Sequence, residues 1–183
     1  GAIGGPHEAT WRTASHIAVA GGHPGSPGLQ GASAPLPAMR VPDHANLVDT
    51  LFERADAHGW SDRPFLRSSA RTLSYRQARS EIHRMAKVLV EDCGLVTGNR
   101  VLLRGGNSVV MALAWLACVK AGMVALATMP LLRSRELGAI LEKAQPSLGL
   151  CDARLTDELA AACEAMPAHP VRRIVLFNGD GAG

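Results

Sequence analysis

Glycines that stand where a phosphate or another anion could bind are the most chemically suggestive residues of this chain. Arg104-Gly105-Gly106-Asn107 joins an apolar run to the start of a helical pattern. The free N–H groups at a helix start attract anions. A tight turn between a strand and a helix calls for the same glycines, so we favour a structural role for them over ligand contact.

Two other glycine-rich stretches have phosphate-like spacing in the wrong surroundings. Gly22, Gly25 and Gly28 have no preceding strand, no following helix and no Gly-Lys-Ser/Thr, so a linker is favoured there. Gly179-Asp180-Gly181-Ala182-Gly183 follows an apparent strand but has no helix after it. Its spacing is therefore weak evidence for a dinucleotide site, and we expect a surface loop.

Residue types that serve metal binding or hydrolysis lack the spacing that those functions need. The chain has neither His-x-x-x-His nor Cys-x-x-Cys, so no metal site is predicted. Ser108, Ser134 and Ser147 lie outside any Gly-x-Ser-x-Gly elbow, and we expect them to cap helices or form turns. The histidines that could have bound a metal are His7, His16, His23, His44, His58, His83 and His169, and the cysteines are Cys93, Cys118, Cys151 and Cys163.

The surroundings of the remaining candidates also favour structural roles. The cysteines have apolar or helical neighbours, which is typical of reduced, packed thiols and favours a cytoplasmic protein. Asp152, Asp157 and Glu158 crowd a predicted helix start, where the helix dipole favours negative charge. We therefore assign no catalytic residue and no metal ligand, and the cofactor-binding residues stay unknown.

Residues 100–150 are the stretch on which the rest of the fold is organised. Short apolar runs alternate there with helical patterns, which predicts an α/β fold with a mostly parallel sheet and flanking helices. The predicted strands are 64–67, 71–73, 101–103, 124–127, 148–151 and 174–177, and the predicted helices are 47–58, 74–93, 109–121, 134–145 and 156–166. The first two strands are expected to form a hairpin, and Ser74 and Gln77 form a capping-box pattern.

The helix predicted over residues 109–121 is apolar on nearly every face. It must be covered on more than one side, since each large apolar side chain left in water would forfeit about 1.5 to 3 kcal/mol. Its apolar run, Val109 to Val119, has 11 residues, whereas a membrane span needs roughly 20. We predict a core helix and no membrane association.

Composition divides the chain into a tail and a domain. Residues 1–42 contain 8 Gly and 6 Pro and few large apolar side chains, so we expect a flexible tail. Residues 43–183 are predicted to form an incomplete N-terminal α/β domain. The chain begins at Gly1 rather than Met, and the strand near its end has no helix to cover it, so we expect a longer natural protein.

Charge and aromatic content argue against nucleic acid as a partner. The formal net charge is +3 without a basic cluster, and the chain has one Tyr and three Phe. Nucleic-acid binding proteins usually present a basic stripe with aromatic stacking surfaces. The oligomeric state stays unknown at this point.

Three stretches together resemble a known family. They are LSYRQARSEIHRMAKVL (73–89), GNRVLLRGGNSVVMALAWLACVKAGMVALATMPLLRSREL (98–137) and QPSLGLCD (145–152). The series is similar to the N-terminal part of acyl- and aryl-CoA synthetases of the adenylate-forming (AMP-dependent synthetase) superfamily, most of all to ligases for benzoate and 2-aminobenzoate. Lys120-Ala121-Gly122 and Pro130-Leu131-Leu132-Arg133 are the closest local matches.

The resemblance implies a two-step reaction. ATP, with Mg²⁺, adenylates a carboxylic acid, here an aromatic one, and the thiol of CoA then displaces AMP. The family's phosphate loop, acidic residue and catalytic Lys have no counterpart in residues 1–183, so the chain is expected to be inactive alone and to bind none of these cofactors tightly.

Two alternatives stay open from the sequence. One is a non-catalytic α/β binding or interaction module. The other is a dinucleotide-dependent oxidoreductase, supported only by the glycine series at the end of the chain.

Overall fold

The computed structural model describes residues 45–178 of the 183-residue chain. The predictions for the tail, for Gly22, Gly25 and Gly28, and for the series from Gly179 to Gly183 lie outside the described residues. The elements are α1 (Leu47–Ala57), β1 (Pro64–Arg67), β2 (Thr72–Ser74), α2 (Tyr75–Lys87), a π-helical turn η1 (Val88–Asp92), β3 (Arg100–Arg104), α3 (Val109–Lys120), β4 (Val124–Thr128), α4 (Ser134–Ala144), β5 (Leu148–Asp152), a 3₁₀ turn η2 (Ala153–Leu155), α5 (Thr156–Glu164) and β6 (Arg173–Phe177).

A parallel four-stranded sheet is the centre of the described part, in the order β4-β3-β5-β6. Leu102 of β3 is in register with Leu126 on one side and with Gly149 on the other. The predicted α/β class with a parallel sheet is confirmed. Because the chain moves from β3 to β4 and then crosses to β5, the strand order reverses beside β3.

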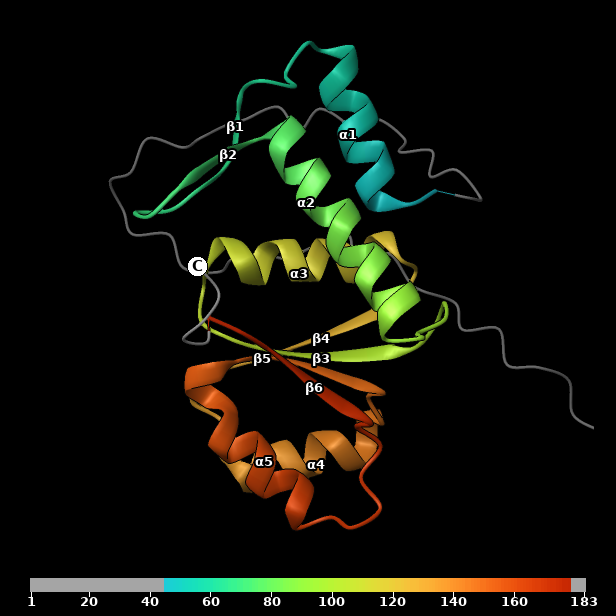
Figure 1. The fold of residues 1–183 in the computed structure, drawn as a ribbon, viewed down its shortest axis with the longest axis vertical. Helices are drawn as coiled ribbons and strands as arrows, with labels where there is room; N and C mark the ends of the chain where they lie inside the picture. The colour runs from blue at the N-terminus through green and yellow to red at the C-terminus, as the bar shows by residue number, and fades with distance from the viewer. Residues whose placement is uncertain (1–44, 179–183) are drawn as a thin grey trace, which may run out of the picture. The chain divides into compact units, whose positions relative to one another are not determined.

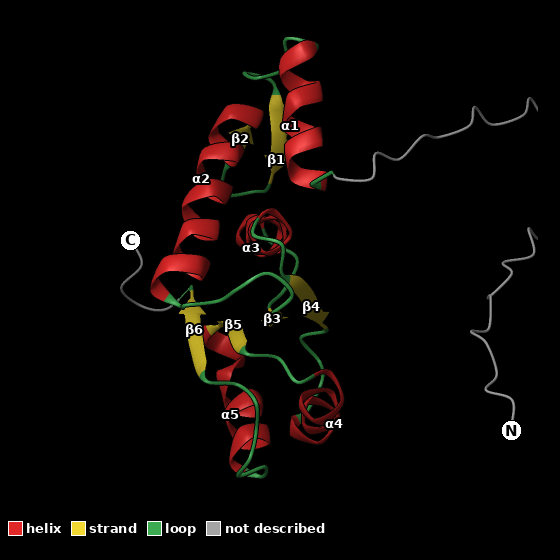
Figure 2. Ribbon diagram, turned by 90° about the vertical axis from the view of Figure 1, so that its right-hand side faces the viewer, coloured by secondary structure: helices red, strands yellow, loops and turns green. Residues whose placement is uncertain are grey.

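Helices cover both faces of this sheet. Figure 1 shows α3 against one face with α2 and α1 beyond it, and α4 and α5 against the other face. The view in Figure 2, turned by 90°, shows the same layers from the side. This arrangement follows from strands that are apolar on both faces and must be buried on both.

Two separate apolar cores result from the alternation along the strands. Val101 and Leu103 pack with α1, α2 and α3, whereas Leu102 between them packs with α4 and α5. All three side chains are fully buried. Arg104 follows Leu103 and points, like Leu102, to the α4–α5 side. It is a buried charged residue in an otherwise apolar strand end, and it bonds the loops beside the candidate site.

Helix α3 lies between the sheet on one side and α1 and α2 on the other, as its all-round apolar composition predicted. Leu113, Ala117 and Cys118 are fully buried, and Trp115 is 38 % exposed near one end of the sheet. No helix in residues 45–178 has the length and apolarity to cross a membrane.

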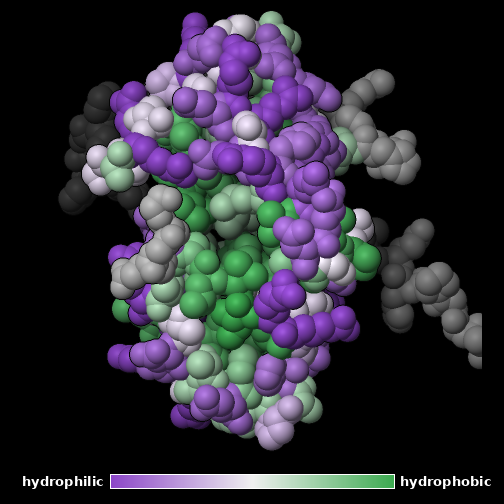
Figure 3. All heavy atoms as spheres, in the orientation of Figure 1, coloured by the Kyte–Doolittle hydropathy of each residue, from purple (hydrophilic) through white to green (hydrophobic). Residues whose placement is uncertain are grey.

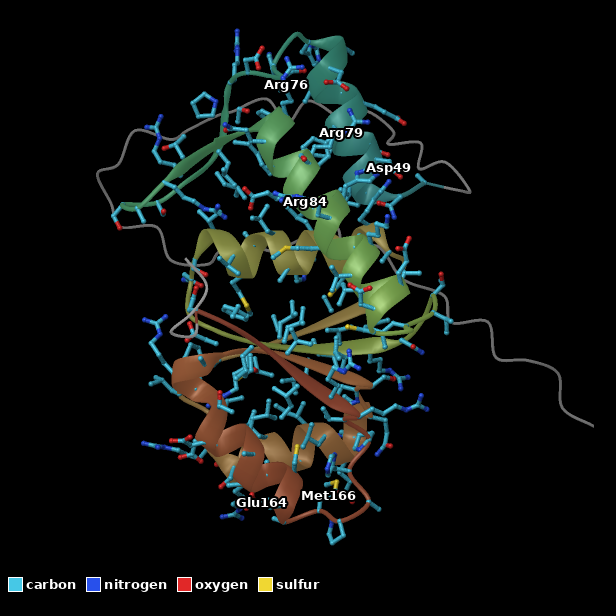
Figure 4. The ribbon with its side chains drawn as sticks, in the orientation of Figure 1. Asp49, Arg76, Arg79, Arg84, Glu164 and Met166 are labelled. Carbon is cyan, nitrogen blue, oxygen red and sulfur yellow. The ribbon has the colours of Figure 1, made fainter. Side chains whose placement is uncertain are left out.

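Polar contacts fasten α1 to the rest of this layer. Asn46 caps α1 by accepting a hydrogen bond from the N–H of Val48 (3.0 Å), and its Nδ2 donates to the carbonyl of Val119 at the end of α3 (2.9 Å). Asp49, labelled in Figure 4, forms an ion pair with Lys120. The start of α1 and the end of α3 are thus held together by side chains from both.

The hairpin and the capping box were predicted correctly. β1 and β2 pair antiparallel, and Ser74 and Gln77 exchange hydrogen bonds at the start of α2. The π-helical turn after α2 was not predicted. Leu89 in this turn and Leu95 after it are buried in the same core, and Gly94 between them ends the segment at φ 64°.

The start of α4 corrects one prediction. Ser134 was expected to cap this helix, but it is the first helical residue and Arg133 is the N-cap. The N–H of Ser134 donates to Oε2 of Glu158 in α5 (2.7 Å), and the N–H of Arg133 donates to Glu136 (3.0 Å). A carboxylate from a neighbouring helix replaces the expected hydroxyl, a tertiary contact that local sequence does not reveal.

Candidate functional site

A hollow of about 480 Å³ opens at the carboxyl ends of β3 and β4, on the α3 side of the sheet. Open α/β sheets bind their ligands at this edge, close to the point where the strand order reverses. The hollow is lined by Gly105, Asn107, Ser108, Met111, Ala112, Trp115, Ala127, Thr128, Met129 and Pro130. They include Gly105 and Asn107 of the stretch Arg104-Gly105-Gly106-Asn107 that the sequence singled out, but neither Arg104 nor Gly106.

Apolar side chains dominate the walls of this hollow. Met111 and Trp115 project from α3, and Met129 and Pro130 follow β4 on the opposite side. Apolar walls with a few polar groups are typical of pockets for small organic molecules. An aromatic ring is well suited to such walls, because Trp and Met both form favourable contacts with aromatic faces and edges.

Two hydroxyl groups in the hollow already have internal roles. Ser108 caps α3, its Oγ accepting a hydrogen bond from the N–H of Met111 (3.1 Å). Thr128 is buried, and its hydroxyl donates to the carbonyl of Leu103 (2.9 Å). The capping role expected for Ser108 is confirmed, and none of the ten lining residues carries a positive charge.

A close approach by two side chains favours glycine at position 105. A Cβ at this position would lie 2.9 Å from Cζ of Phe177 and 3.3 Å from Sδ of Met111. Neither Gly105 nor Gly106 has a positive φ. The reason for glycine at position 105 is therefore packing between the ends of β3 and β6, rather than the backbone freedom that a turn would need.

Arg104 takes no part in an anion site on the α3 side. Its side chain is 1 % exposed and donates to four carbonyl oxygens on the α4–α5 side of the strand ends. The acceptors are the carbonyls of Leu155 (3.0 Å), Met129 (3.3 Å), Pro130 (3.2 Å) and Leu132 (2.9 Å). The guanidinium thus fixes the loop that forms the rim of the hollow.

A second hollow of about 330 Å³ lies beside the first and shares Pro130 with it. Four of its five charged lining residues, Arg104, Arg133, Arg154 and Glu158, are bonded within the fold. Arg133 donates to Glu158 (2.8 Å), and hydrogen bonds from Arg133 and then from the N–H of Ser134 lower the pKa of Glu158. Because these charges satisfy each other, this second hollow offers little free charge to a ligand.

Asp152 joins the carboxyl ends of β5 and β6. Its carboxylate is 2 % exposed and accepts from Nη2 of Arg154 (2.6 Å) and from Nδ2 of Asn178 (2.9 Å). The hydrogen bond from Arg154 holds the pKa of Asp152 well below its usual range, against the opposing effect of burial. Asp152 also accepts from the N–H of Arg154, which matches the structural role expected at this turn.

The cysteines and histidines form no reactive cluster in residues 45–178. Cys118, Cys151 and Cys163 are buried free thiols and Cys93 is half-buried. Burial raises the pKa of Cys118 to about 12, so this thiol stays protonated. His58 stacks on Trp60, and the described residues contain no group of three His, Cys, Asp or Glu that could hold a metal.

These residues do not fit ATP and Mg²⁺. Triphosphate binding calls for Lys or Arg and free backbone N–H groups, and Mg²⁺ calls for carboxylate or phosphate oxygens. Arg104 is fully used by carbonyls, and Asp152 is used by Arg154 and Asn178. The hollow offers an apolar wall to a ligand.

The sequence profile of the family described as AMP-binding enzyme matches residues 52–182. This match covers most of the chain, including every strand of the parallel sheet. The chain belongs to the AMP-binding enzyme family. The predicted superfamily is confirmed, and the described residues form part of an AMP-binding domain.

A curated relative of this AMP-binding domain is a salicyl-AMP ligase / salicyl-S-ArCP synthetase of Mycobacterium tuberculosis (strain ATCC 25618 / H37Rv). The two are 30% identical over an alignment of 177 residues, which covers 89% of this chain and 31% of the relative. The chain therefore spans about a third of the length of this relative.

Solved structures share the fold. An anthranilate CoA ligase, AuaEII, in complex with anthranoyl-AMP matches at a TM-score of 0.68 and 21% identity, over 75% of this chain and 26% of that one. A benzoate CoA ligase from Burkholderia xenovorans LB400 matches at a TM-score of 0.65 and 17% identity, over 73% and 26%. The N-terminal domain of FACL13 from Mycobacterium tuberculosis matches at 0.62 and 25%, over 72% and 33%.

Proposed function

We propose that this AMP-binding domain is part of an enzyme that activates an aromatic carboxylic acid with ATP and transfers the acyl group to the thiol of CoA. In the first step a carboxylate oxygen attacks the α-phosphorus of ATP, giving an acyl-AMP and pyrophosphate. In the second step the thiol attacks the acyl carbon and AMP leaves. The observation that carries the proposal is the family match over residues 52–182, with a salicyl-AMP ligase as a relative at 30% identity.

In this enzyme the described residues act as a structural framework and perform no chemical step. In our proposal the hollow beside α3 contributes one wall of the region that takes the acid, because its lining is apolar and carries Trp115 and Met111. ATP, Mg²⁺ and CoA are bound by residues outside this chain. The free buried thiols favour a reducing compartment such as the cytoplasm.

The first step is tested by exchange of radioactive pyrophosphate into ATP. The gene that encodes this chain is read to its natural stop codon, and the product is assayed with salicylate, benzoate and anthranilate, with octanoate as an aliphatic control. We expect exchange that depends on an aromatic acid and on Mg²⁺. A product that exchanges with none of the aromatic acids would contradict the proposal.

The thiol acceptor is the second question, because the name of the curated relative contains salicyl-S-ArCP synthetase. A protein-borne thiol is therefore the alternative to CoA. Once the acid is known, transfer of its radioactive acyl group to CoA and to a carrier protein bearing a pantetheine thiol is compared. Our proposal predicts faster transfer to CoA, and transfer to the carrier alone would reassign the acceptor without affecting the first step.

A further inference from the structure

A groove of about 410 Å³ lies between the end of α2 and the end of α3, which cross in Figure 1. Helix α3 begins with its cap Ser108 at the candidate site and has 12 residues, so the groove lies at the other end of a helix about 18 Å long. We call it the basic groove. Its lining residues are His83, Arg84, Ala86, Lys87, Val90, Glu91, Lys120 and Ala121.

Helix α2 collects basic side chains on its outer side. Arg76, Arg79, His83, Arg84 and Lys87 are all exposed. Most of them lie three or four positions apart, which places their side chains next to one another along the helix. Figure 3 shows a strip of hydrophilic surface along α2, and Figure 4 labels the first, second and fourth of these residues. The sequence shows no basic cluster because other residues are interspersed, and the helix creates one.

The two basic residues nearest the start of α2 are paired within the fold. Arg76 forms an ion pair with Asp62 (2.9 Å), and Arg79 forms one with Asp56 (2.8 Å). Both carboxylates come from the segment before α2. This part of the helix therefore has little charge left for a partner.

The basic residues at the groove are less fully paired. Arg84 forms no ion pair with any other residue in 45–178. Lys87 pairs with Glu91 at 3.5 Å, and both side chains are more than half exposed. Such an exposed pair is weak and exchanges partners readily. Lys120, on the opposite wall, is held by Asp49, so Arg84 and Lys87 are the cations that can meet a partner.

The floor between these cations is apolar. Ala86 on α2 and Ala121 after α3 are small and leave the groove its depth. The π-helical turn places Leu89 in the core and leaves Val90 beside it 46% exposed. An apolar centre with a charged margin is the usual composition of a surface that another polypeptide covers.

We propose that the basic groove binds an acidic amphipathic helix of a partner protein. The apolar side of such a helix lies on Val90 and the two alanines, and its carboxylates pair with Arg84 and Lys87. A lipid bilayer is flat and does not enter a groove. Nucleic-acid binding favours aromatic stacking surfaces, and none of the eight lining residues is Phe, Tyr or Trp. The inference does not depend on the proposed function, because the groove and the hollow lie at opposite ends of α3.

Binding of a defined peptide to the longer gene product, read to its natural stop codon, tests the proposal. The probe is a fluorescein-labelled helical peptide of leucine, alanine and glutamate with the leucines along one side, and the control peptide has glutamine in place of glutamate. Fluorescence anisotropy should show saturable binding of the glutamate peptide that weakens as salt is added. The glutamine peptide should bind about 10-fold more weakly. Equal binding of the two peptides, or binding of neither, would overturn the proposal.

Charge reversal shows where the peptide binds. The double variant Arg84→Glu, Lys87→Glu should bind the glutamate peptide about 10-fold more weakly than the wild type. Arg135→Glu, Lys143→Glu is the matched control, since both residues are exposed on α4 and the net charge changes equally. Its binding should stay within about twofold of the wild type. Equal losses in the two double variants would reduce the binding to attraction by net charge and contradict the proposal.

Val90→Asn tests the apolar floor without changing any charge. It should weaken binding of the glutamate peptide about threefold or more, because an apolar contact is lost. Val96→Asn is the control, since Val96 is 65% exposed and lies outside the groove. If Val90→Asn binds as tightly as the wild type, the groove does not dock an amphipathic helix.

Other partners and the enzymatic reaction give separate results. Binding of a DNA duplex, or of vesicles of phosphatidylserine and phosphatidylcholine, that is lost in the Arg84→Glu, Lys87→Glu variant while the peptide does not bind would overturn the proposal. Bound peptide should leave acid-dependent exchange of pyrophosphate unchanged, because the hollow is at the other end of α3. A longer product that binds the peptide in the groove but catalyses no exchange supports the docking surface and refutes the proposed function, and an active enzyme that does not bind the peptide does the reverse.

Discussion

Arg104 is the residue on which the geometry of the candidate site depends most. Five N–H donors on a rigid fork suit it to gather several carbonyls at once, which a lysine cannot do. Its four acceptors belong to two separate loops at the ends of β4 and β5. Without the guanidinium of Arg104, these four carbonyl oxygens would lose their hydrogen-bond donor.

Arg104→Met is predicted to destabilise the chain by about 2 to 4 kcal/mol, since it leaves buried carbonyls without donors. Urea denaturation of the 183-residue chain measures the change. Arg104→Lys should fall between the wild type and the Met variant. Arg67→Met, at an exposed position, serves as the control and should stay within about 0.5 kcal/mol; a similar loss there would remove the special role of Arg104.

Asp152 makes stability depend on pH. Its pKa is lowered in the folded chain, chiefly by the hydrogen bond from Arg154, whereas an unfolded Asp titrates near about 3.9. The stabilisation is therefore complete above about pH 4 to 5 and is lost as the pH falls through the unfolded pKa toward the folded one.

Asp152→Asn should therefore lower the free energy of unfolding by about 2 to 3 kcal/mol at pH 7 and by progressively less at lower pH. Urea titrations at pH 7, 5, 4 and 3 measure the difference. Asp92→Asn, which removes an exposed carboxylate, should change the value at pH 7 by no more than about 0.5 kcal/mol. A difference between wild type and Asp152→Asn that grows as the pH falls would contradict the assignment.

Residue roles were the part of the structure least predictable from sequence. The capping roles of Ser74 and Ser108 could be predicted, because a cap acts within one turn of its own helix. The role of Arg104 depends on carbonyls 25 to 51 positions away in the chain. The only local signal was that Arg104, a charged residue, ends an apolar strand and lies two positions after the buried Leu102, so that its side chain is on the same face of the strand.

At the scale of the elements, local patterns predicted nearly all of the helices and strands. Apolar runs of three or four residues and helical stripes between them were sufficient, because each element meets only one or two layers of the fold. The π-helical turn at residues 88–92 and the N-cap at Arg133 were missed. Both depend on which side chains the neighbouring elements place opposite them.

Gly122, the last residue of the Lys-Ala-Gly match, ends α3 in a left-handed conformation at φ 71°. A Cβ there would lie 3.0 Å from Cγ2 of Thr97. Gly122→Ala is therefore predicted to destabilise the chain by about 1 to 2 kcal/mol, as measured by thermal or urea denaturation.

Gly106→Ala is the matched control for that substitution. Gly106 has no positive φ, and a Cβ there would meet nothing within 4 Å. Its effect should be within about 0.5 kcal/mol. If both glycines tolerate alanine equally, backbone conformation is not the reason for Gly122.

At the scale of the whole molecule, the described residues are a framework with an apolar wall at one end of α3 and the basic groove at the other. The buried Arg104 and Asp152 use their hydrogen bonds to hold the carboxyl ends of the strands together. Family membership came from the order of short motifs over residues 73–152, which are elements of this framework. The acid of our proposal could not be read from the sequence, because the lining of the hollow beside α3 includes no charged group that would select it.

Exchange of pyrophosphate into ATP, measured side by side on the 183-residue chain and on the longer gene product, tests the central claim most directly. The account predicts exchange that depends on an aromatic acid in the longer product and none above background in the 183-residue chain. Acid-dependent exchange by the 183-residue chain itself, or its absence from the longer product with every aromatic acid, would contradict the account.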